Sequence, residues 1–477
     1  MKKIFMWLIV LVVSISMVAS FALTGCKEEP VEEVVAEEEV VAEEEVVAEV
    51  EAETTYEGVT LTIASVNNPD MLVMEELGTV FTDETGIELN FVILPENELR
   101  QKVTEDVGLG AGKFDIVTIG TYDTPFWGAN NWVVSLEPFF EGMSDEELAA
   151  YDRSDFIAPI ISALSLNGEQ YAIPFYGESS MVFYRKDLFE AAGLVMPNAP
   201  TWQEIYDFAV ELNDPEEGIV GIALRGLPGW GENMAVFCTM INAFGARWFD
   251  MDWNPQFNTP EMKEVWEFYK KIQDDAGLPG ASTAGFTEGL NFMSTGKAAM
   301  WYDATVAAGI IKAAADPAIG DNIGYALAPS YKKENTGWLW AWSLAIEAAS
   351  KNQDAAFKFL TWASSKDYQE LVASEKGWEL VPPGTRESLY LNPNYKDLPF
   401  AARTIEAMKN ADYDEPTVDP VPYKGVQYVS IPEFQDLGTK VAQLLAAYLT
   451  GQKTVDEALE EAQADALEVA TDGGYLK

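Results

Sequence analysis

Strand-forming and helix-forming segments alternate along the chain from residue 59 to residue 120. Three runs rich in β-branched and aromatic residues predict strands, and the two stretches between them have the apolar spacing of helices; in chain order they are Val59–Ser65, Met71–Thr82, Gly86–Leu94, Glu96–Asp106 and Phe114–Ile119. Strands separated by single helices pair in the same direction, with the helices covering the sheet. The chain is therefore predicted to be an α/β protein with a doubly wound parallel sheet.

Sheets of this kind bind ligands at the carboxyl ends of their strands. The loops expected to meet at a site are Ser65–Pro69, Pro95–Asn97 and Gly120–Trp127. Further strands are predicted at Tyr171–Phe175, Gly218–Leu224, Ala298–Tyr302, Ile323–Ala328 and Gly337–Ile346, before a mainly helical C-terminal part that ends with Val455–Thr471. Two α/β lobes account for the roughly 419 residues after residue 58 better than one lobe does.

The first 26 residues are predicted to be a targeting segment. Lys2 and Lys3 precede the apolar run Ile4–Phe21, and the small residues before Cys26 are typical of a secretory signal peptide. The sequence Leu-Thr-Gly-Cys26 resembles a bacterial lipobox, in which cleavage leaves the cysteine as a lipidated N-terminus. An uncleaved signal anchor is the alternative. Both place the domain outside the cytoplasm, in the periplasm or on the outer face of the cytoplasmic membrane, with the lipid as its only membrane contact if the segment is cleaved.

Residues 27–58 are a low-complexity segment in which Val-Val-Ala-Glu-Glu-Glu repeats from Val34 onward. A six-residue period advances about 240° per repeat on a helix, so the valines cannot form one apolar stripe. Fourteen Glu against one Lys favour a disordered, self-repelling tether. We interpret it as a spacer that holds the domain away from anionic lipid; a solvated spacer without such a role is the alternative.

The composition excludes several classes of function. The chain contains no histidine, which removes Ser-His-Asp catalysis, HExxH zinc sites and imidazole proton transfer. A formal charge of −48 opposes nucleic acid binding and favours neutral or cationic ligands. With Cys26 assigned to the lipid, no intrachain disulfide is possible, and Cys238 is predicted to be a buried packing residue. No cofactor and no metal site is predicted.

One acidic segment has two interpretations. Its side chains match oxygen ligands of an EF-hand calcium loop at Asp250, Asp252, Asn254, Asn258 and Glu261. That loop needs glycine at its sixth position, where this chain has Pro255, and Thr259-Pro-Glu261 is typical of a helix start. We interpret the segment as a helix start, with calcium near Asp250 as the alternative.

Several aromatic and acidic residues are candidates for ligand contact. The glycine-rich segment Gly226–Asn233 lacks the P-loop lysine and is predicted to be a bent loop that presents Trp230, Glu232 and Asn233. Trp338, Trp340 and Trp342 occupy alternate positions, so on a strand their side chains share one face. They are predicted either to pack in the core or to contact sugar rings. Trp342 is assigned to the core. Glu178 and Asp303 both follow predicted strands and could form the carboxylate pair of a glycosidase.

Eleven segments, taken in order, resemble the sorbitol/mannitol-type polyol-binding proteins, within the sugar-binding proteins (type 1) of bacterial ABC importers. Among them are Val66-Asn-Asn-Pro-Asp-Met71, Leu99-Arg-Gln101, Phe114-Asp-Ile-Val-Thr-Ile-Gly120, Pro174-Phe-Tyr-Gly-Glu-Ser-Ser180, Pro228-Gly-Trp-Gly-Glu-Asn233, Met300-Trp-Tyr-Asp-Ala-Thr305, Val381-Pro-Pro-Gly-Thr-Arg386 and Pro422-Tyr-Lys-Gly-Val-Gln427. The likeness runs from about Val59 to Gln463, and the tether lies outside it.

The resemblance implies a two-lobed periplasmic-binding-protein fold, maltose-binding-protein-like, with the ligand in a cleft between the lobes. It assigns residues 59–171 and 298–333 to the first lobe and residues 172–297 and 334–477 to the second. It implies that hydroxyl groups are bound by polar side chains and that tryptophans cover the C–H face. The expected ligand-binding residues are Asn68, Glu96, Tyr122, Asp123, Trp127, Tyr176, Glu178, Arg225, Trp230, Asn233, Asp303, Trp338 and Arg386. Relatives more often have Glu where this chain has Asp123, which would alter the preferred polyol.

The function implied is capture without catalysis. The chain would bind a neutral polyol or sugar, close its lobes around it and deliver it, as a monomer, to the membrane subunits of an ABC permease. Two alternatives stay open at this point: a lipid-anchored receptor that signals its bound ligand, and a surface glycosidase that uses Glu178 and Asp303.

Overall fold

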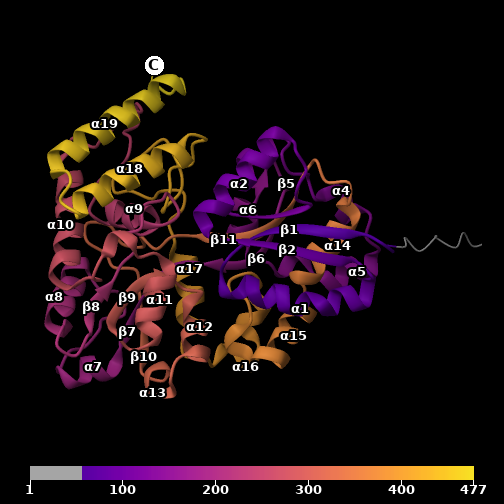
Figure 1. The fold of residues 1–477 in the computed structure, drawn as a ribbon, viewed down its shortest axis with the longest axis horizontal. Coiled ribbons are helices and arrows are strands. Elements are labelled where there is room, and N and C mark those ends of the chain that lie inside the picture. The colour runs from indigo at the N-terminus through magenta and orange to yellow at the C-terminus, as the bar shows by residue number, and fades with distance from the viewer. Residues whose placement is uncertain (1–55, 477) are drawn as a thin grey trace, which may run out of the picture. The chain divides into compact units, whose positions relative to one another are not determined.

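The structure, a computed structural model, describes residues 56–476, which form two β-sheets with helices around each (Figure 1). The strand order is β2-β1-β3-β11-β6 in the first sheet and β10-β7-β9-β8 in the second. We call each sheet with the helices packed on it the first lobe and the second lobe. The predicted signal segment 1–26 and the tether, apart from its last three residues, lie outside the described residues.

The first lobe begins with the predicted alternation. Its elements in chain order are β1 (Thr60–Val66), α1 (Pro69–Thr85), β2 (Glu88–Leu94), α2 (Glu96–Leu109) and β3 (Ile116–Ile119). β1 pairs in parallel with both β2 and β3, so the parallel sheet is confirmed for these three strands. The two remaining strands, β11 (Trp340–Ile346) and β6 (Ile173–Glu178), make the sheet mixed, because β11 runs antiparallel to β3 and to β6.

The second sheet contains β7 (Ser180–Arg185), β8 (Val220–Ala223), β9 (Ala298–Ala304) and β10 (Ile323–Leu327). β7 was not predicted from the sequence; it follows β6 after one residue, Ser179, where the chain crosses from one sheet to the other. A separate two-stranded hairpin is formed by β4 (Ser165–Leu166) and β5 (Glu169–Gln170).

The strand pairings correct the expected lobe boundaries. β9 and β10, within the segment 298–333 that we assigned to the first lobe, lie in the second sheet, and β11 and β6, which we assigned to the second lobe, lie in the first. The chain passes between the two sheets twice, at Ser179 and between residues 328 and 339. The apolar periodicity of a strand does not show which sheet that strand joins, which is why the boundaries were misplaced.

The remaining helices cover the sheets and connect the strands. Those before β6 are α3 (Asp123–Ala129), α4 (Glu137–Glu141), α5 (Asp145–Tyr151) and α6 (Ala158–Ala163); those between β7 and β9 are α7 (Lys186–Ala191), α8 (Trp202–Leu212), α9 (Asn233–Ala243), α10 (Pro260–Ala276) and α11 (Phe286–Ser294). After β9 come α12 (Ala307–Ala314), α13 (Pro317–Gly320), α14 (Gln353–Ala363), α15 (Lys366–Lys376), α16 (Pro393–Lys396), α17 (Ala401–Asn410), α18 (Phe434–Leu449) and α19 (Val455–Asp472). None of the helices within residues 56–476 combines the length and apolar character that crossing a membrane requires.

Two local predictions are confirmed by these elements. α9 is buried along its whole length and contains Cys238, whose thiol is buried as expected. α10 begins at Pro260 after the cap Thr259, whose side chain accepts a hydrogen bond from the Met262 backbone N–H. The segment interpreted as a helix start is therefore one.

Glu347, directly after β11, is almost fully buried, and neither of its carboxylate oxygens has a hydrogen-bond partner among the described residues. Burial and the negative charges of Asp106 and Asp115 raise the pKa of this carboxyl to about 8, from an ordinary value of 4.5. Between these two values the folded chain holds a proton that the unfolded chain has lost. The contribution of Glu347 to the free energy of unfolding therefore falls as the pH rises from about 4.5 to about 8.

We expect Glu347→Gln to reduce this fall, measured as the free energy of unfolding in urea at pH 5, 6.5 and 8. The matched control is Glu137→Gln, because hydrogen bonds from Arg153 lower the pKa of Glu137 and place its titration below this window. Identical pH slopes for the wild-type chain and Glu347→Gln would show that Glu347 is not the group that titrates.

Candidate ligand-binding pocket

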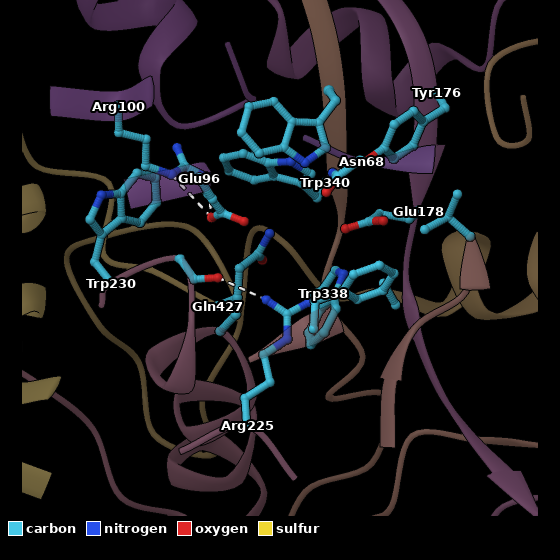
Figure 2. Close-up of a pocket in the computed structure, with 16 residues that line it drawn as sticks. Asn68, Glu96, Arg100, Tyr176, Glu178, Arg225, Trp230, Trp338, Trp340 and Gln427 are labelled. Atoms are coloured by element: carbon cyan, nitrogen blue, oxygen red, sulfur yellow. Dashed lines mark hydrogen bonds and ion pairs between the residues drawn. The ribbon is translucent and has the colours of Figure 1, made fainter. Parts of the chain in front are cut away.

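A pocket lies at one edge of the first sheet and is lined from both lobes (Figure 2). The carboxyl ends of β1, β2 and β6 meet at this edge, and so does the amino end of the antiparallel β11. The lining residues are Asn68, Glu96, Arg100, Tyr176, Glu178, Trp340 and Trp342 from the first lobe, Arg225, Trp230, Gly231, Ala235, Phe286, Ala304 and Val306 from the second, and Trp338 and Gln427 from connecting segments. Two of the three loops predicted to meet at a site therefore contribute to it directly.

Arg100, on the first turns of α2, forms one of two buried ion pairs at the pocket. Its Nη2 and Nε donate to Glu96 Oε1 at 2.9 and 3.1 Å, and its Nη1 donates to Asp123 Oδ2 at 3.5 Å. The guanidinium also stacks 4.0 Å from the ring centre of Trp230, a residue of the second lobe. Arg100 is thereby held in one place and connects the two lobes.

Arg225, just after β8, forms the second ion pair. Its Nε and Nη2 donate to the two oxygens of Asp303, on β9, at 2.8 and 2.7 Å, and its Nη1 donates to the Gly231 carbonyl at 3.0 Å. Asp303 has no exposed surface. Glu232 lies 3.7 Å from Arg225, and burial together with the charge of Glu96 raises the pKa of its carboxyl to about 8.

Aromatic rings form the apolar walls of the pocket. Trp340 lies 5.7 Å from Trp342 and 6.0 Å from Trp230 between ring centres, and each is at most 5% exposed. Trp338, just before β11, also lines the pocket, so the three alternating tryptophans share one side as predicted. Trp342 is buried in the core as assigned, and it also lines the pocket, 4.8 Å from the Arg100 guanidinium.

Glu178, the last residue of β6, differs from the other acids of the pocket. Its carboxylate makes no hydrogen bond or ion pair with any residue that the structure describes, although only 7% of the residue is exposed. Burial, followed by the charges of Asp303 and Glu96, raises the pKa of this carboxyl well above its ordinary value, against the opposing effect of Arg225. Nearby, Asn68 Nδ2 donates to the Tyr176 hydroxyl at 2.7 Å.

The structure brings seven of the thirteen expected ligand-binding residues to the pocket: Asn68, Glu96, Tyr176, Glu178, Arg225, Trp230 and Trp338. Three others lie directly behind it. Asp123 and Asp303 hold Arg100 and Arg225, and Tyr122 packs against Trp230 with its hydroxyl donating to the carbonyls of Ile431 and Pro432. The side chain of Asp123 faces Arg100. The shorter Asp in place of Glu therefore changes how Arg100 is held and does not change a wall of the pocket.

The last three expected residues are placed elsewhere. Trp127 packs against Trp132, and Asn233 is fully buried with its amide donating to the Ala442 carbonyl. Arg386 has no exposed surface; it donates to the carbonyls of Ser364 and Asp152 and stacks over Phe156. Since Arg386 is held inside the first lobe by these contacts, its assignment to the pocket is corrected to a structural role.

Five large side chains of the pocket were not among the expected ligand-binding residues: Arg100, Trp340, Trp342, Gln427 and Phe286. Arg100 lies four residues after Glu96, a spacing that puts two side chains on the same face of a helix, so this signal was available. Trp340 belongs to the recognised alternation. Gln427 and Phe286 come from distant loops, and no local pattern marks them.

Two alternatives lose support from the geometry. Both oxygens of Asp303 are bonded to Arg225, so the carboxylate cannot reach a sugar and act with Glu178 as a glycosidase pair. Asp250 accepts hydrogen bonds from Asp252, Asn254 and Gln256 of its own loop. Within residues 56–476, no group of three or more acidic or cysteine side chains is arranged to hold a metal ion.

Comparisons with known proteins point to one family. The sequence profile of the bacterial extracellular solute-binding proteins matches residues 66–370. A mannitol-binding protein of Pseudomonas aeruginosa is 46% identical over 420 residues, which cover 88% of this chain and 94% of the relative. A solute-binding protein of an ABC transporter from Agrobacterium vitis, solved with bound D-mannitol, superposes with a TM-score of 0.83 at 49% identity and covers 88% of this chain and 100% of its own.

A maltose-bound protein of Thermotoga maritima superposes with a TM-score of 0.72 at 19% identity, covering 86% of this chain and 100% of that one. This more distant likeness shows the fold alone. Together the solved structures confirm the predicted two-lobed α/β class.

Proposed function

The chain belongs to the bacterial extracellular solute-binding proteins, and from that premise we propose that it captures a linear polyol of the mannitol or sorbitol type for import. The observation that carries the proposal is the pocket: two fixed guanidinium groups and an unpaired carboxyl face four tryptophans in a space lined from both lobes. Guanidinium groups and carboxyls bind hydroxyls, and indole rings cover the C–H side of an extended polyol. The mannitol-binding relatives span nearly the whole chain and support the same ligand class.

Capture follows from lobe closure. The contact of Arg100 with Trp230 joins the first lobe to the second at the rim of the pocket. A polyol bound between Glu178 and Arg225 adds contacts to both lobes at once, so its binding selects the closed population. The closed form then delivers the polyol to the membrane subunits of an ABC permease, and no bond in the ligand is broken.

The family is extracellular, and we propose that a lipid on Cys26 keeps the monomeric domain on the outer face of the cytoplasmic membrane. The lipobox-like sequence at Cys26 supports this anchor. Cells that express Cys26→Ser should release the protein into the soluble fraction, whereas Cys238→Ser should leave it in the membrane fraction. Equal membrane retention of both variants would remove the anchor from the proposal.

The ligand class is tested by isothermal titration calorimetry with D-mannitol, D-sorbitol, ribitol, D-glucose and maltose. We expect saturable binding of D-mannitol or D-sorbitol and no binding of maltose, because a disaccharide is bulkier than a pocket closed by four indole rings accepts. The absence of binding to every alditol would overturn the proposal.

A further inference from the structure

The charges at the pocket do not balance. Two guanidinium groups, of Arg100 and Arg225, face five carboxyl groups in the pocket wall and directly behind it: Glu96, Asp123, Glu178, Glu232 and Asp303. Arg100 is shared by Glu96 and Asp123, and Arg225 is shared by Asp303 and Glu232. Both cations are therefore used, and Glu178 is left without one.

Glu178 is nine-tenths buried, and its carboxylate is aimed into the open space of the pocket. Figure 2 shows it pointing from β6 into the gap between Trp340 and Trp338. A carboxylate in such a place is costly unless a cation or several donors reach it. Burial raises the pKa of this carboxyl well above its ordinary value, so protonation lowers that cost.

The surroundings of Glu178 suit a small organic cation. Indole rings attract cations over their faces, and Trp338 and Trp340 lie on either side of the carboxylate. The formal charge of −48 draws cations toward the protein as a whole. A primary ammonium is compact and has three donors, enough for Glu178 and a neighbouring acceptor such as the Tyr176 hydroxyl.

We propose that the pocket also takes protonated amino polyols, linear polyols with a terminal ammonium in place of one hydroxyl, and that Glu178 binds the ammonium. This inference rests on the polyol-binding function proposed above and extends its ligand class. The second half of the ligand would be bound as a polyol is, by the arginines and the indole rings.

The proposed binding of an ammonium predicts a measurable release of protons. An ammonium pairs with the carboxylate form of Glu178, so its binding shifts the carboxyl toward that form; a proton on the carboxyl leaves to the solvent, and only that O–H bond breaks. A neutral polyol brings no charge and leaves the carboxyl protonated. The titratable and charged groups that face Glu178 are Asp70 on α1, Glu96 on α2, Tyr176 on β6, Arg225 after β8 and Asp303 on β9.

The experiment compares D-mannitol with 1-amino-1-deoxy-D-mannitol, which differ only at one terminal group. The full chain is titrated calorimetrically at pH 7 in two buffers of different ionisation enthalpy. We expect the amino polyol to bind at least as tightly as D-mannitol and to release protons, seen as an enthalpy that changes with the buffer. The enthalpy of D-mannitol should be the same in both.

Glu178→Gln should remove the buffer dependence and lower the ratio of amino polyol affinity to D-mannitol affinity at least tenfold. Glu137→Gln is the matched control, because Glu137 is paired with Arg153 away from the pocket, and this variant should keep the proton release. If Glu178→Gln does not fold, the buffer comparison on the wild-type chain decides alone.

Binding of D-mannitol without binding of the amino polyol would overturn this inference and leave the polyol function intact. Binding of the amino polyol with a buffer-independent enthalpy would overturn it as well. Failure of both ligands to bind would instead overturn the proposed function on which the inference rests.

Discussion

Arg225→Ala is expected to lower the free energy of unfolding by about 3–5 kcal/mol and to abolish polyol binding, because it leaves a buried carboxylate without its cation. Asp303 has no exposed surface, and both of its oxygens accept from Arg225. The same arginine donates to the Gly231 carbonyl and lines the pocket, so its loss also loosens the loop that carries Trp230. Urea denaturation and calorimetry with D-mannitol measure the two effects.

The matched control is Arg153→Ala. Arg153 also forms a bidentate ion pair, donating to the two carboxylate oxygens of Glu137 at 2.9 and 2.8 Å. The side chains of Arg153 and Glu137 are, however, 34% and 30% exposed. Water can solvate Glu137 after the change, so we expect a loss of no more than about 1 kcal/mol and unchanged binding. Equal losses for the two variants would contradict the view that burial makes the Arg225 pair critical.

Gly120→Ala is expected to displace a wall of the pocket. A Cβ at this position, directly after β3, would lie 1.9 Å from the Trp340 ring. The indole cannot move away freely, because Trp230, Trp342 and Tyr428 surround it with ring centres 5.7 to 6.2 Å away. Forced repacking of this kind costs about 1–3 kcal/mol, and we expect the affinity for D-mannitol to fall more than tenfold.

Gly108→Ala separates this effect from glycine replacement in general. Gly108 lies within α2, and the nearest atom to its new Cβ, on Trp132, is 4.0 Å away. Alanine there should raise the free energy of unfolding by up to about 1 kcal/mol and leave binding unchanged. An affinity for Gly120→Ala within twofold of the wild-type value would show that Trp340 is not needed at its observed position.

Those pocket residues that are placed by neighbouring elements of the chain could be predicted from the sequence. Asn68 and Glu96 lie two residues after the ends of β1 and β2, and the carboxyl ends of parallel strands meet at one edge, so both line the pocket as expected. Trp338 and Trp340 were recognised by their alternation. Glu178 was a candidate because it follows a predicted strand, and the resemblance added Arg225, whose environment no periodicity reveals.

The remaining assignments failed where tertiary contacts decide. Arg386 and Asn233 are polar residues near loops, but backbone carbonyls far away in sequence accept their hydrogen bonds and keep them from the pocket. The lobe boundaries failed for a similar reason. β11 inserts antiparallel between β3 and β6, and strand partners far apart in the chain leave no mark in the local pattern of apolar residues.

The proposed function requires a linear polyol to bind between Glu178, Arg225 and the tryptophan walls. A crystal structure of the protein grown with D-mannitol tests it most directly. We expect one intact mannitol in this pocket, with its hydroxyls bonded to Glu178 and to an arginine and its carbon chain against an indole ring. Mannitol density at another place on the protein, with this pocket empty, would contradict it.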